Sequence, residues 1–345
     1  MSATPIPLRH ALAARPPGRR RGPQRPGAAR TQRGAALLMA MNIVTLVITL
    51  AAGMVWQQWR AVQVEAAERA RVQAAWILTG ALDWARLILR EDARTGGADH
   101  LGEPWAVPLA EARLSTFLAA DKDNTDDAPD AFLSGRIVDE HSRFNLSNLV
   151  DDAGKVLPDE LAALERLCQA LGVATDVAKR IAEGLRDASA PPGAAGESAG
   201  SSATAALLPR NVGQLAWFGV SGEALGRLEP YVTLLPTRTL INANTASREV
   251  LVATVKGLDL ASAENLLRVR QRSHFKTPAD VLAQIPGLTQ GTTPPIGVVS
   301  NFFEVRGRLR LGDRVLEQRS LVERRGLEVV LLQREQVASR EAAGP

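Results

Sequence analysis

Cysteine is nearly absent from this sequence: Cys168 is the single cysteine among 345 residues. One cysteine excludes an internal disulfide and a zinc site made of several thiolates. Cys168 lies at helical intervals from Leu164 and Leu171, which places it on the apolar face of a predicted helix. We therefore interpret Cys168 as a buried structural thiol and not as a nucleophile.

Catalytic motifs are absent as well. The four histidines, His10, His100, His141 and His274, lack a metal-ligand spacing such as that of HExxH. The sequence contains no nucleophile elbow, phosphate-binding loop or dinucleotide fingerprint. It therefore offers no catalytic residues, and we predict that the protein is not an enzyme.

Excess basic charge is confined to one end of the chain. The net charge is +4, from 41 basic and 37 acidic residues, but residues 1–34 contain eight arginines and no acid. Without those eight arginines, 33 basic residues face 37 acidic ones, a net charge of −4. The body of the protein therefore has no general attraction for nucleic acid, and we expect no nucleic-acid partner.

A run of 22 residues without charge follows this basic segment, from Ala35 to Trp56. As a helix it would be roughly 33 Å long, enough to cross a bilayer core of about 30 Å. The preceding arginines place the N-terminus on the cytoplasmic side, and Trp56 and Trp59 suit the opposite interface. The run therefore predicts a single membrane span with the main domain on the outer side.

The predicted helix continues past the membrane boundary. Apolar residues keep a helical spacing to about Arg94, with no proline between Pro26 and Pro104, and Gly96 with Gly97 ends the pattern. A cleaved secretory signal has an apolar run of only about 7–15 residues. The small residues near Ala52 also form a weak cleavage site. A plain signal anchor is the other alternative.

The start of the apolar run resembles that of a type IV prepilin. A basic leader ends in Arg33-Gly34, Ala35 is small, and the apolar run continues as an amphipathic helix. The resemblance implies that a prepilin peptidase cleaves between Gly34 and Ala35 and methylates Ala35. It also implies that the helix lies in the lipid of the inner membrane while the main domain is periplasmic.

One position departs from the usual precursor. Most members of this class carry Glu at the fifth mature position, where this chain has Met39. A carboxylate in lipid needs a partner, such as the N-terminal amine of a neighbouring subunit. Its absence predicts a subunit at the tip of a filament. The K minor pseudopilins of type II secretion usually share this feature, and that resemblance implies that Met39, Leu46 and Leu50 pack against companion minor pseudopilins in the membrane.

The rest of the chain has helical and extended regions. Alternating apolar and charged residues predict three antiparallel strands, Phe303–Leu311, Val315–Val322 and Leu327–Gln333. Helical spacing dominates residues 145–290, apart from a low-complexity loop at 187–206 that we expect to be flexible. We predict an α+β fold: a long N-terminal pilin-type helix packed on a small antiparallel sheet, with a large inserted α-helical domain.

The predicted organisation has seven segments. These are a basic leader (1–34), the transmembrane part (35–56) and the periplasmic part (57–95) of the N-terminal helix, a sheet-proximal segment (96–144), the inserted helical domain (145–290), the antiparallel strands (291–335) and a tail (336–345). Within the inserted domain we expect Thr245 and Ser262 to supply capping groups near two helix starts.

Two phrases of the inserted domain resemble helix-hairpin-helix units of exported DNA receptors. They are Asn242-Ala-Asn-Thr-Ala and Phe275-Lys-Thr-Pro-Ala-Asp-Val-Leu. Such units present backbone N–H groups to a phosphate, but the first hairpin here carries Asp259 where the anion would lie. The same phrases, with Phe144–Leu149 and Tyr231–Pro236, resemble the K pseudopilin family. A membrane-anchored DNA-binding or competence-type protein is the alternative.

Acidic residues gather between Asp121 and Asp130. An EF-hand loop would need Gly at its sixth position and Glu at its twelfth, where Asp126 and Phe132 stand. Members of the K family can bind calcium in their helical domain, so the resemblance implies calcium as the one candidate cofactor. The corresponding stretch here, Arg186–Gly193, has lost most carboxylates, and a solvated acidic loop is the alternative.

In combination, these phrases resemble a minor pseudopilin of type II secretion. The resemblance implies a protein that caps the tip of a periplasmic pseudopilus and aids the export of folded proteins across the outer membrane. The implied partners are other minor pseudopilins, the secretion platform and the prepilin peptidase. A minor pilin of another assembly system is the remaining alternative.

Overall fold

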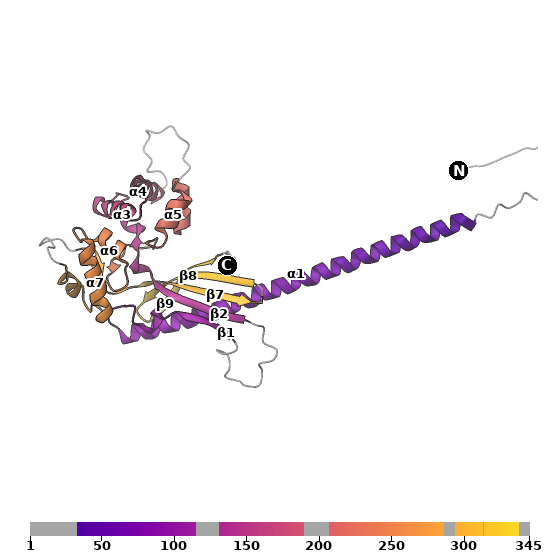
Figure 1. Cartoon of the computed structure of the whole chain (residues 1–345), viewed down its shortest axis with the longest axis horizontal. Helices are drawn as coiled ribbons and strands as arrows, with labels where there is room; N and C mark the ends of the chain where they lie inside the picture. Colours follow the sequence, from indigo (N-terminus) through magenta and orange to yellow (C-terminus); the bar gives the residue numbers. More distant parts are fainter. Residues whose placement is uncertain (1–32, 115–130, 190–206, 286–293, 313, 338–345) are drawn as a thin grey trace, which may run out of the picture. The chain divides into compact units, whose positions relative to one another are not determined.

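The computed structural model describes residues 33–114, 131–189, 207–285, 294–312 and 314–337 (Figure 1). The described chain combines helices with an antiparallel sheet, which confirms the predicted α+β class. It divides into two compact units, residues 1–66 and 67–345. The long helix α1 (Arg33–Thr95) contributes to both units and includes the predicted span 35–56.

The first unit, described from Arg33 onward, is part of α1. Every side chain from Gly34 to Ala66 is exposed. Among the described residues, α1 is the one helix long and apolar enough to cross a membrane. Inside this span the hydroxyls of Thr45 and Thr49 donate to the carbonyls of Asn42 and Leu46, at 2.9 and 2.8 Å. Both hydroxyls are therefore satisfied within the helix, as a lipid environment requires.

The second unit contains a five-stranded antiparallel sheet in the order β1-β2-β7-β8-β9. Its strands are β1 (Leu109–Arg113), β2 (Ala131–Asp139), β7 (Phe302–Leu311), β8 (Arg314–Arg325) and β9 (Glu328–Val337). The last three are the predicted meander. β2 pairs with β7 along its whole length, from Ala131–Leu311 to Asp139–Phe303, so segments far apart in the sequence are neighbours.

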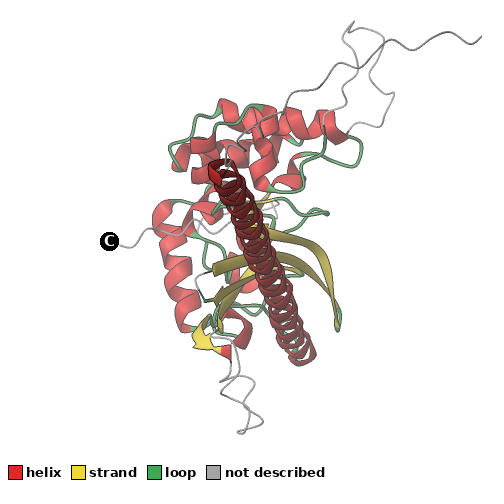
Figure 2. Cartoon of the chain, turned by 90° about the vertical axis from the view of Figure 1, so that its right-hand side faces the viewer, coloured by secondary structure: helices red, strands yellow, loops and turns green. Residues whose placement is uncertain are grey.

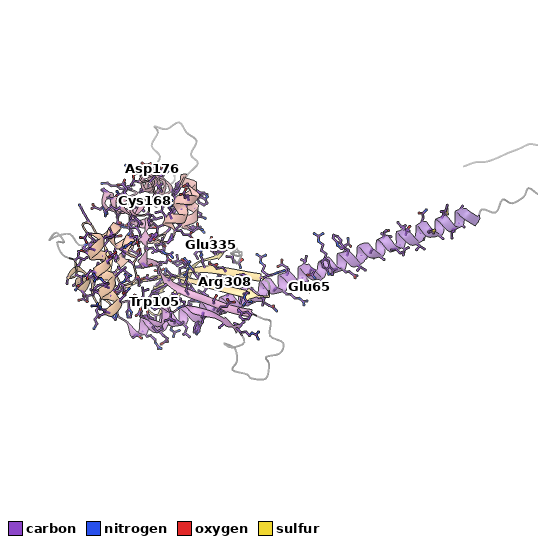
Figure 3. All side chains as sticks on the ribbon, in the orientation of Figure 1. Glu65, Trp105, Cys168, Asp176, Arg308 and Glu335 are labelled. Atoms are coloured by element: carbon purple, nitrogen blue, oxygen red, sulfur yellow. The ribbon has the colours of Figure 1, made fainter. Side chains whose placement is uncertain are left out.

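One face of this sheet packs against α1 (Figure 2). The contacting residues recur at helical intervals on α1 and at alternate positions on the strands, as the geometry of each element requires. Trp105, labelled in Figure 3, belongs to the short helix η1 (Pro104–Ala106) and is buried in this core. Its ring is edge-on to that of Phe303, with the ring centroids 5.3 Å apart. The buried members are Ala74, Leu78, Leu82, Ala85, Leu89, Trp105, Ala131, Leu133, Phe303, Val305, Leu309, Val322 and Val329.

The described residues 143–297, called the helical block here, connect β2 to β7. Their helices are η3 (Leu146–Leu149), α3 (Pro158–Ala170), α4 (Asp176–Ser189), η4 (Val212–Phe218), α5 (Gly222–Leu228), α6 (Arg248–Thr254), α7 (Leu260–Arg272) and α8 (Pro278–Leu282). Two short parallel strand pairs complete it, β3 (Phe144–Asn145) with β4 (Val232–Thr233), and β5 (Ile241–Asn242) with β6 (Ile296–Gly297).

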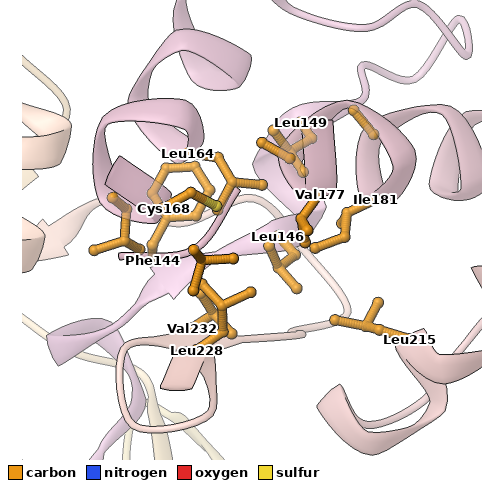
Figure 4. Packing of buried hydrophobic residues seen from close by; sticks show 14 of the residues in the cluster. Phe144, Leu146, Leu149, Leu164, Cys168, Val177, Ile181, Leu215, Leu228 and Val232 are labelled. Atoms are coloured by element: carbon orange, nitrogen blue, oxygen red, sulfur yellow. The ribbon is translucent and has the colours of Figure 1, made fainter. Parts of the chain in front are cut away.

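The helical block has two apolar clusters rather than one. The first lies mainly among α3, α4 and α5, and the second among α6, α7 and α8. Cys168 is fully buried in the first cluster, with Leu164, Phe144 and Val232 around it (Figure 4). Burial raises the pKa of its thiol to about 11. Cys168 is therefore a packed side chain, as its spacing predicts.

Two predicted helix caps are wrong by two or three residues. Ser247 caps α6, since its side chain accepts the Val250 N–H at 3.3 Å. Asp259 caps α7 and accepts the Ser262 N–H at 2.7 Å. In both cases the capping residue directly precedes the helix, where the first N–H groups have no partner within the helix. Thr245 instead donates to a buried carboxylate.

The first three residues of the predicted loop 187–206 are helical, which corrects that boundary of the prediction. α4 continues to Ser189, whose hydroxyl donates to the Leu185 carbonyl at 2.6 Å. Residues 190–206 lie outside the described residues, as do the leader 1–32, the acidic stretch 121–130 and the last eight positions.

Candidate functional site

The predicted processing residues lie at the start of α1. Gly34 and Ala35 are in its first turn, and both are exposed. Met39, Leu46 and Leu50 are also exposed, and spacings of seven and four residues place them on one side of the helix. The first unit therefore offers an accessible cleavage position and an apolar side for packing in lipid. Cleavage, methylation and packing at these residues stay predictions.

α1 has a further exposed apolar side in the second unit, formed by Val72, Trp76, Trp84 and Leu87. These side chains are 53, 72, 50 and 49% exposed. Helical spacing places Val72, Trp76 and Leu87 on the side of α1 that faces away from the sheet, and Trp84 at the edge of that side. An exposed apolar surface with two tryptophans is typical of a protein interaction site.

An apolar groove of about 240 Å³ opens beside Trp84, between α1 and the sheet. Val107, which is 68% exposed, lines its entrance. Part of the hollow arises because Gly135 on β2 is directly opposite Gly307 on β7, so neither strand supplies a side chain there. A Cβ atom at Gly307 would lie 3.1 Å from Leu78 of α1, so glycine allows this close approach.

A buried carboxylate, Asp139, joins the sheet to the helical block. Its side chain accepts hydrogen bonds from Thr245 Oγ1 at 2.6 Å, Ser300 Oγ at 2.7 Å, Asn242 Nδ2 at 3.0 Å and the His141 N–H at 2.8 Å. Burial raises the pKa of Asp139, and these four hydrogen bonds oppose the rise. Because the donors come from separate parts of the chain, Asp139 fixes the block–sheet junction.

Arg324 on β8 continues this junction toward the end of α1. Its guanidinium lies 2.5 Å from Asp92 and 2.6 Å from Asp99, and it also donates to the Ser300 carbonyl. Burial raises the pKa of Asp99, and Arg324 opposes that rise. An ion pair this well buried also carries enough hydrogen bonds to offset part of its desolvation.

Two asparagines explain the phrase Phe144-Asn-Leu-Ser-Asn-Leu. Asn145 donates to the Thr237 carbonyl at 2.8 Å and to Thr239 Oγ1 at 3.0 Å. Asn148 both donates to the Thr239 carbonyl at 2.9 Å and accepts the Thr239 N–H at 3.0 Å. Each side-chain amide pairs with backbone groups of the loop around Thr237 and Thr239 that have no strand or helix partner among the described residues. These two asparagines therefore connect distant parts of the helical block.

The phrases that resemble a DNA-binding hairpin have the same internal role. Asn244 donates to the Phe275 carbonyl and accepts the Phe275 N–H, each at 2.9 Å. Arg270 donates to the carbonyls of Ala243 and Ala246, and burial lowers its pKa to about 10. The guanidinium of Arg270 is therefore used for hydrogen bonds inside the protein. The start of α7, where a phosphate would bind, is occupied by the side chain of Asp259. A second hairpin of this kind would involve Pro286-Gly-Leu-Thr289, which lies outside the described residues.

An acidic cluster of Asp92, Asp99 and Glu103 is the nearest approach to a metal site among the described residues, with ligand atoms within 4.8 Å of one another. Arg324 already supplies positive charge there. Glu103 accepts the His100 N–H at 2.9 Å and Trp105 Nε1 at 2.7 Å. We therefore assign this cluster a structural role, while calcium at the predicted positions stays untested.

Sequence reasoning missed the buried acids of the junction, Asp139 and Glu140. The available signal was slight: two adjacent acids follow the apolar strand residues Ile137 and Val138. Glu140 begins the short helix η2 (Glu140–Ser142), which follows β2 directly. Among the described residues, no histidine side chain is hydrogen-bonded to a serine, threonine or cysteine side chain.

Comparison with known proteins identifies similar chains of one kind. The family described as "Type II secretion system (T2SS), protein K" matches residues 142–237 and 241–298. A type II secretion system protein K of Pseudomonas aeruginosa is 31% identical over 306 residues, covering 83% of this chain and 86% of that protein. The protein K of Pectobacterium carotovorum is 28% identical over 330 residues, covering 88% and 96%.

A solved structure has a similar fold. It is a chain of "The Crystal Structure of the GspK-GspI-GspJ complex from enterotoxigenic Escherichia coli Type 2 Secretion System", with a TM-score of 0.59 and 21% identity. The match covers 79% of this chain and 99% of that chain. At this identity the likeness concerns the fold.

Proposed function

Because this chain belongs to the type II secretion system protein K family, we propose that it caps the tip of the periplasmic pseudopilus. It is a minor pseudopilin of that system. The proposed role at the tip follows from the size and placement of the helical block, which is inserted between two neighbouring strands of the sheet. The bulk of the block would obstruct a further subunit that approached this end of the filament to pack against α1.

The observation that supports this proposal is the attachment of the block to the sheet through buried polar contacts. Thr245 and Asn242 of the block donate to the buried carboxylate of Asp139 at the end of β2, and Thr233 of the block donates to Glu140. A loosely tethered domain would move aside and leave the end of the filament open. A block held by buried polar contacts stays in place, because breaking them would leave buried donors unsatisfied.

Maturation and membrane insertion form a second part of the proposal. A prepilin peptidase removes the basic leader between Gly34 and Ala35 and methylates Ala35. The span then holds the protein in the lipid of the inner membrane, with the second unit in the periplasm, where the secretion platform assembles the filament. The charge-free run after eight arginines supports this orientation.

Companion minor pseudopilins are the proposed direct partners. The solved chain of similar fold was crystallised with GspI and GspJ, as its title states. By analogy we place companions of those two kinds along α1. Met39, Leu46 and Leu50 would contact them in the membrane, and the side with Trp76 and Trp84 would contact them outside it. The 49–72% exposure of Val72, Trp76, Trp84 and Leu87 supports this placement.

N-terminal sequencing of the protein from membranes tests the proposal. We expect an N-methylated Ala35 in cells with the prepilin peptidase and the uncleaved leader in cells without it. Gly34→Val is a matched variant, since it alters the residue before the cut and should retain the leader. A start near Ala52 in both strains, or an intact leader in both, would contradict the proposed maturation and hence the filament role.

A further inference from the structure

A pair of buried carboxyl groups lies at the block–sheet junction, next to Asp139. Glu140 begins η2 at the end of β2, and Glu304 is on β7. Their side chains are 3 and 12% exposed. Arg143 Nη1 is 3.0 Å from Glu140 Oε1 and 3.3 Å from Glu304 Oε2, so a single guanidinium contacts both carboxyl groups.

Glu140 also contacts the helical block directly. Thr233, on β4, donates its hydroxyl to Glu140 Oε2. β4 pairs with β3, and the Phe144 N–H donates to the Tyr231 carbonyl at 2.8 Å. The contact between Glu140 and Thr233 therefore connects the sheet to the first part of the block.

The other charges facing the pair come from neighbouring elements, and one is Arg136 on β2, which lies opposite Arg306 of β7 and interacts with Glu304. Arg306 on β7 contacts Glu304 at 2.5 and 3.0 Å. Arg319 on β8 is 3.9 Å from Glu304, but it pairs more closely with Glu229 of the block, at 2.9 Å. A groove of about 210 Å³ opens beside the pair, and its remaining charged lining is Arg210 from the block and Glu335 from β9.

The two carboxyl groups differ in their affinity for protons. Burial raises the pKa of Glu140 to about 7, an effect that Glu304 reinforces and Arg143 opposes. Burial acts in the same direction on Glu304, but Arg306 and Arg143 outweigh it and lower the pKa of Glu304. The two groups titrate as a coupled pair, and this pair gains or loses one proton around neutral pH.

We propose that this carboxyl pair makes the attachment of the helical block to the sheet proton-dependent, firm while the pair holds one proton and weaker when both groups are ionised. The second ionisation places two negative charges beside a shared arginine in a poorly hydrated site. Separating the block from the sheet hydrates Glu140 and relieves that repulsion. The inference rests on this junction alone and holds whether or not the protein caps a filament.

The sign of the pH dependence follows from linkage. A group whose pKa is higher in the folded than in the unfolded state stabilises the fold below its unfolded pKa, and this contribution disappears as the pH rises through the folded value. For Glu140 these values are 4.5 and about 7. Raising the pH from about 5.5 to about 8.5 should therefore lower the folding equilibrium constant on the order of tenfold.

Thermal or urea unfolding of the full chain in detergent micelles tests the proposal, together with hydrogen exchange of the β4 amides. For the unaltered protein we expect a fall in stability over this pH range and faster exchange at Val232 and Thr233. Glu140→Gln imitates the protonated group, so it should remove both effects. Glu304→Gln removes the like charge, so it should move the transition to lower pH.

Glu229→Gln is the matched control, because Glu229 lines the same groove but pairs with Arg319. This variant should keep the full pH dependence. Two results would overturn the proposal. One is an unaltered protein whose β4 exchange, corrected for its intrinsic pH dependence, is the same at both pH values. The other is a Glu140→Gln variant that retains the slope of the unaltered protein.

Discussion

The two units of this molecule treat apolar surface in different ways. Residues 34–66 of α1 are exposed on every side, whereas from Ala74 onward the same helix buries one side against the sheet. The second unit also provides partners for its own buried acids: Asp139 accepts hydrogen bonds from neighbouring residues, and Arg324 pairs with Asp92 and Asp99. The exposed apolar side chains of the first unit can be covered only by lipid and by other chains. The single helix α1 therefore combines a segment suited to lipid with a segment suited to a protein core.

The largest loss of stability is expected from replacing Asp139, whose buried carboxylate accepts four hydrogen bonds within the second unit. Asp139→Ala should lower the free energy of unfolding of the full chain by about 4 kcal/mol, since it leaves several buried donors without an acceptor. Asp139→Asn keeps one acceptor oxygen and should lose less. Urea unfolding followed by tryptophan fluorescence measures both. Asp152→Ala, at an exposed position, is the control, and equal effects at 139 and 152 would contradict the assigned role.

A matched pair of leucines compares the two parts of α1 directly. Leu89 is fully buried against the sheet, whereas Leu50 is 58% exposed in the first unit. Leu89→Ala should cost about 3 kcal/mol of unfolding free energy because it leaves a cavity. Leu50→Ala should leave that free energy nearly unchanged. If both substitutions destabilise the fold alike, the division at Ala66 has no energetic meaning.

Trp84 combines exposure with contact to the core: it is 50% exposed, although it belongs to the part of α1 that packs on the sheet and it lines the apolar groove there. Trp84→Ala should weaken binding of companion minor pseudopilins about tenfold, or ~1.4 kcal/mol, with a smaller effect on unfolding. Binding is measured by titration of companions in detergent. Trp217→Ala is the control, because Trp217 is similarly exposed, at 55%, but belongs to η4. If both variants lost affinity for the companions equally, the groove beside Trp84 would not be part of the binding interface.

The smallest effect is expected at Cys168. A maleimide should leave this thiol almost unmodified in the folded chain at pH 8, because the side chain is buried and its pKa is about 11. Unfolding in urea should make it react fully. A cysteine introduced at Gln63, an exposed position of the first unit, should react without urea in a Cys168→Ala background. Rapid labelling of Cys168 in the folded chain would show that this core opens readily.

Much of the fold was predictable because its signals are local. The uncharged run fixes the start of α1, the glycines at 96 and 97 follow its end, and strict alternation identifies β7, β8 and β9. Local spacing also places Cys168 in a core. The prepilin-like start and the asparagine phrases led to the correct family, although the comparisons, and not the geometry, establish it.

The block–sheet junction was not predictable, because its contacts are distant in sequence. Asn242 is 103 positions from Asp139, and Ser300 is 161 positions from it. No periodicity relates residues so far apart, and an acid at the end of a strand is normally exposed. Thr245 illustrates the difficulty, since its hydroxyl suits a cap but instead contacts Asp139. Glu140 acquires its partner Glu304 only when β2 pairs with β7.

That pairing has a consequence for how the chain acquires its structure during synthesis. β2 must wait for β7, and β7 is made only after the entire helical block. Contacts between sequence neighbours form early, whereas closing so long an intervening segment is entropically costly and slow. β1 and β2 are made before the block and can meet α1 early, but α1 lacks β7, β8 and β9 until those last strands emerge. A nascent chain of this kind exposes Leu78, Leu82 and Leu89 until late, and in that interval it is most vulnerable to aggregation and proteolysis.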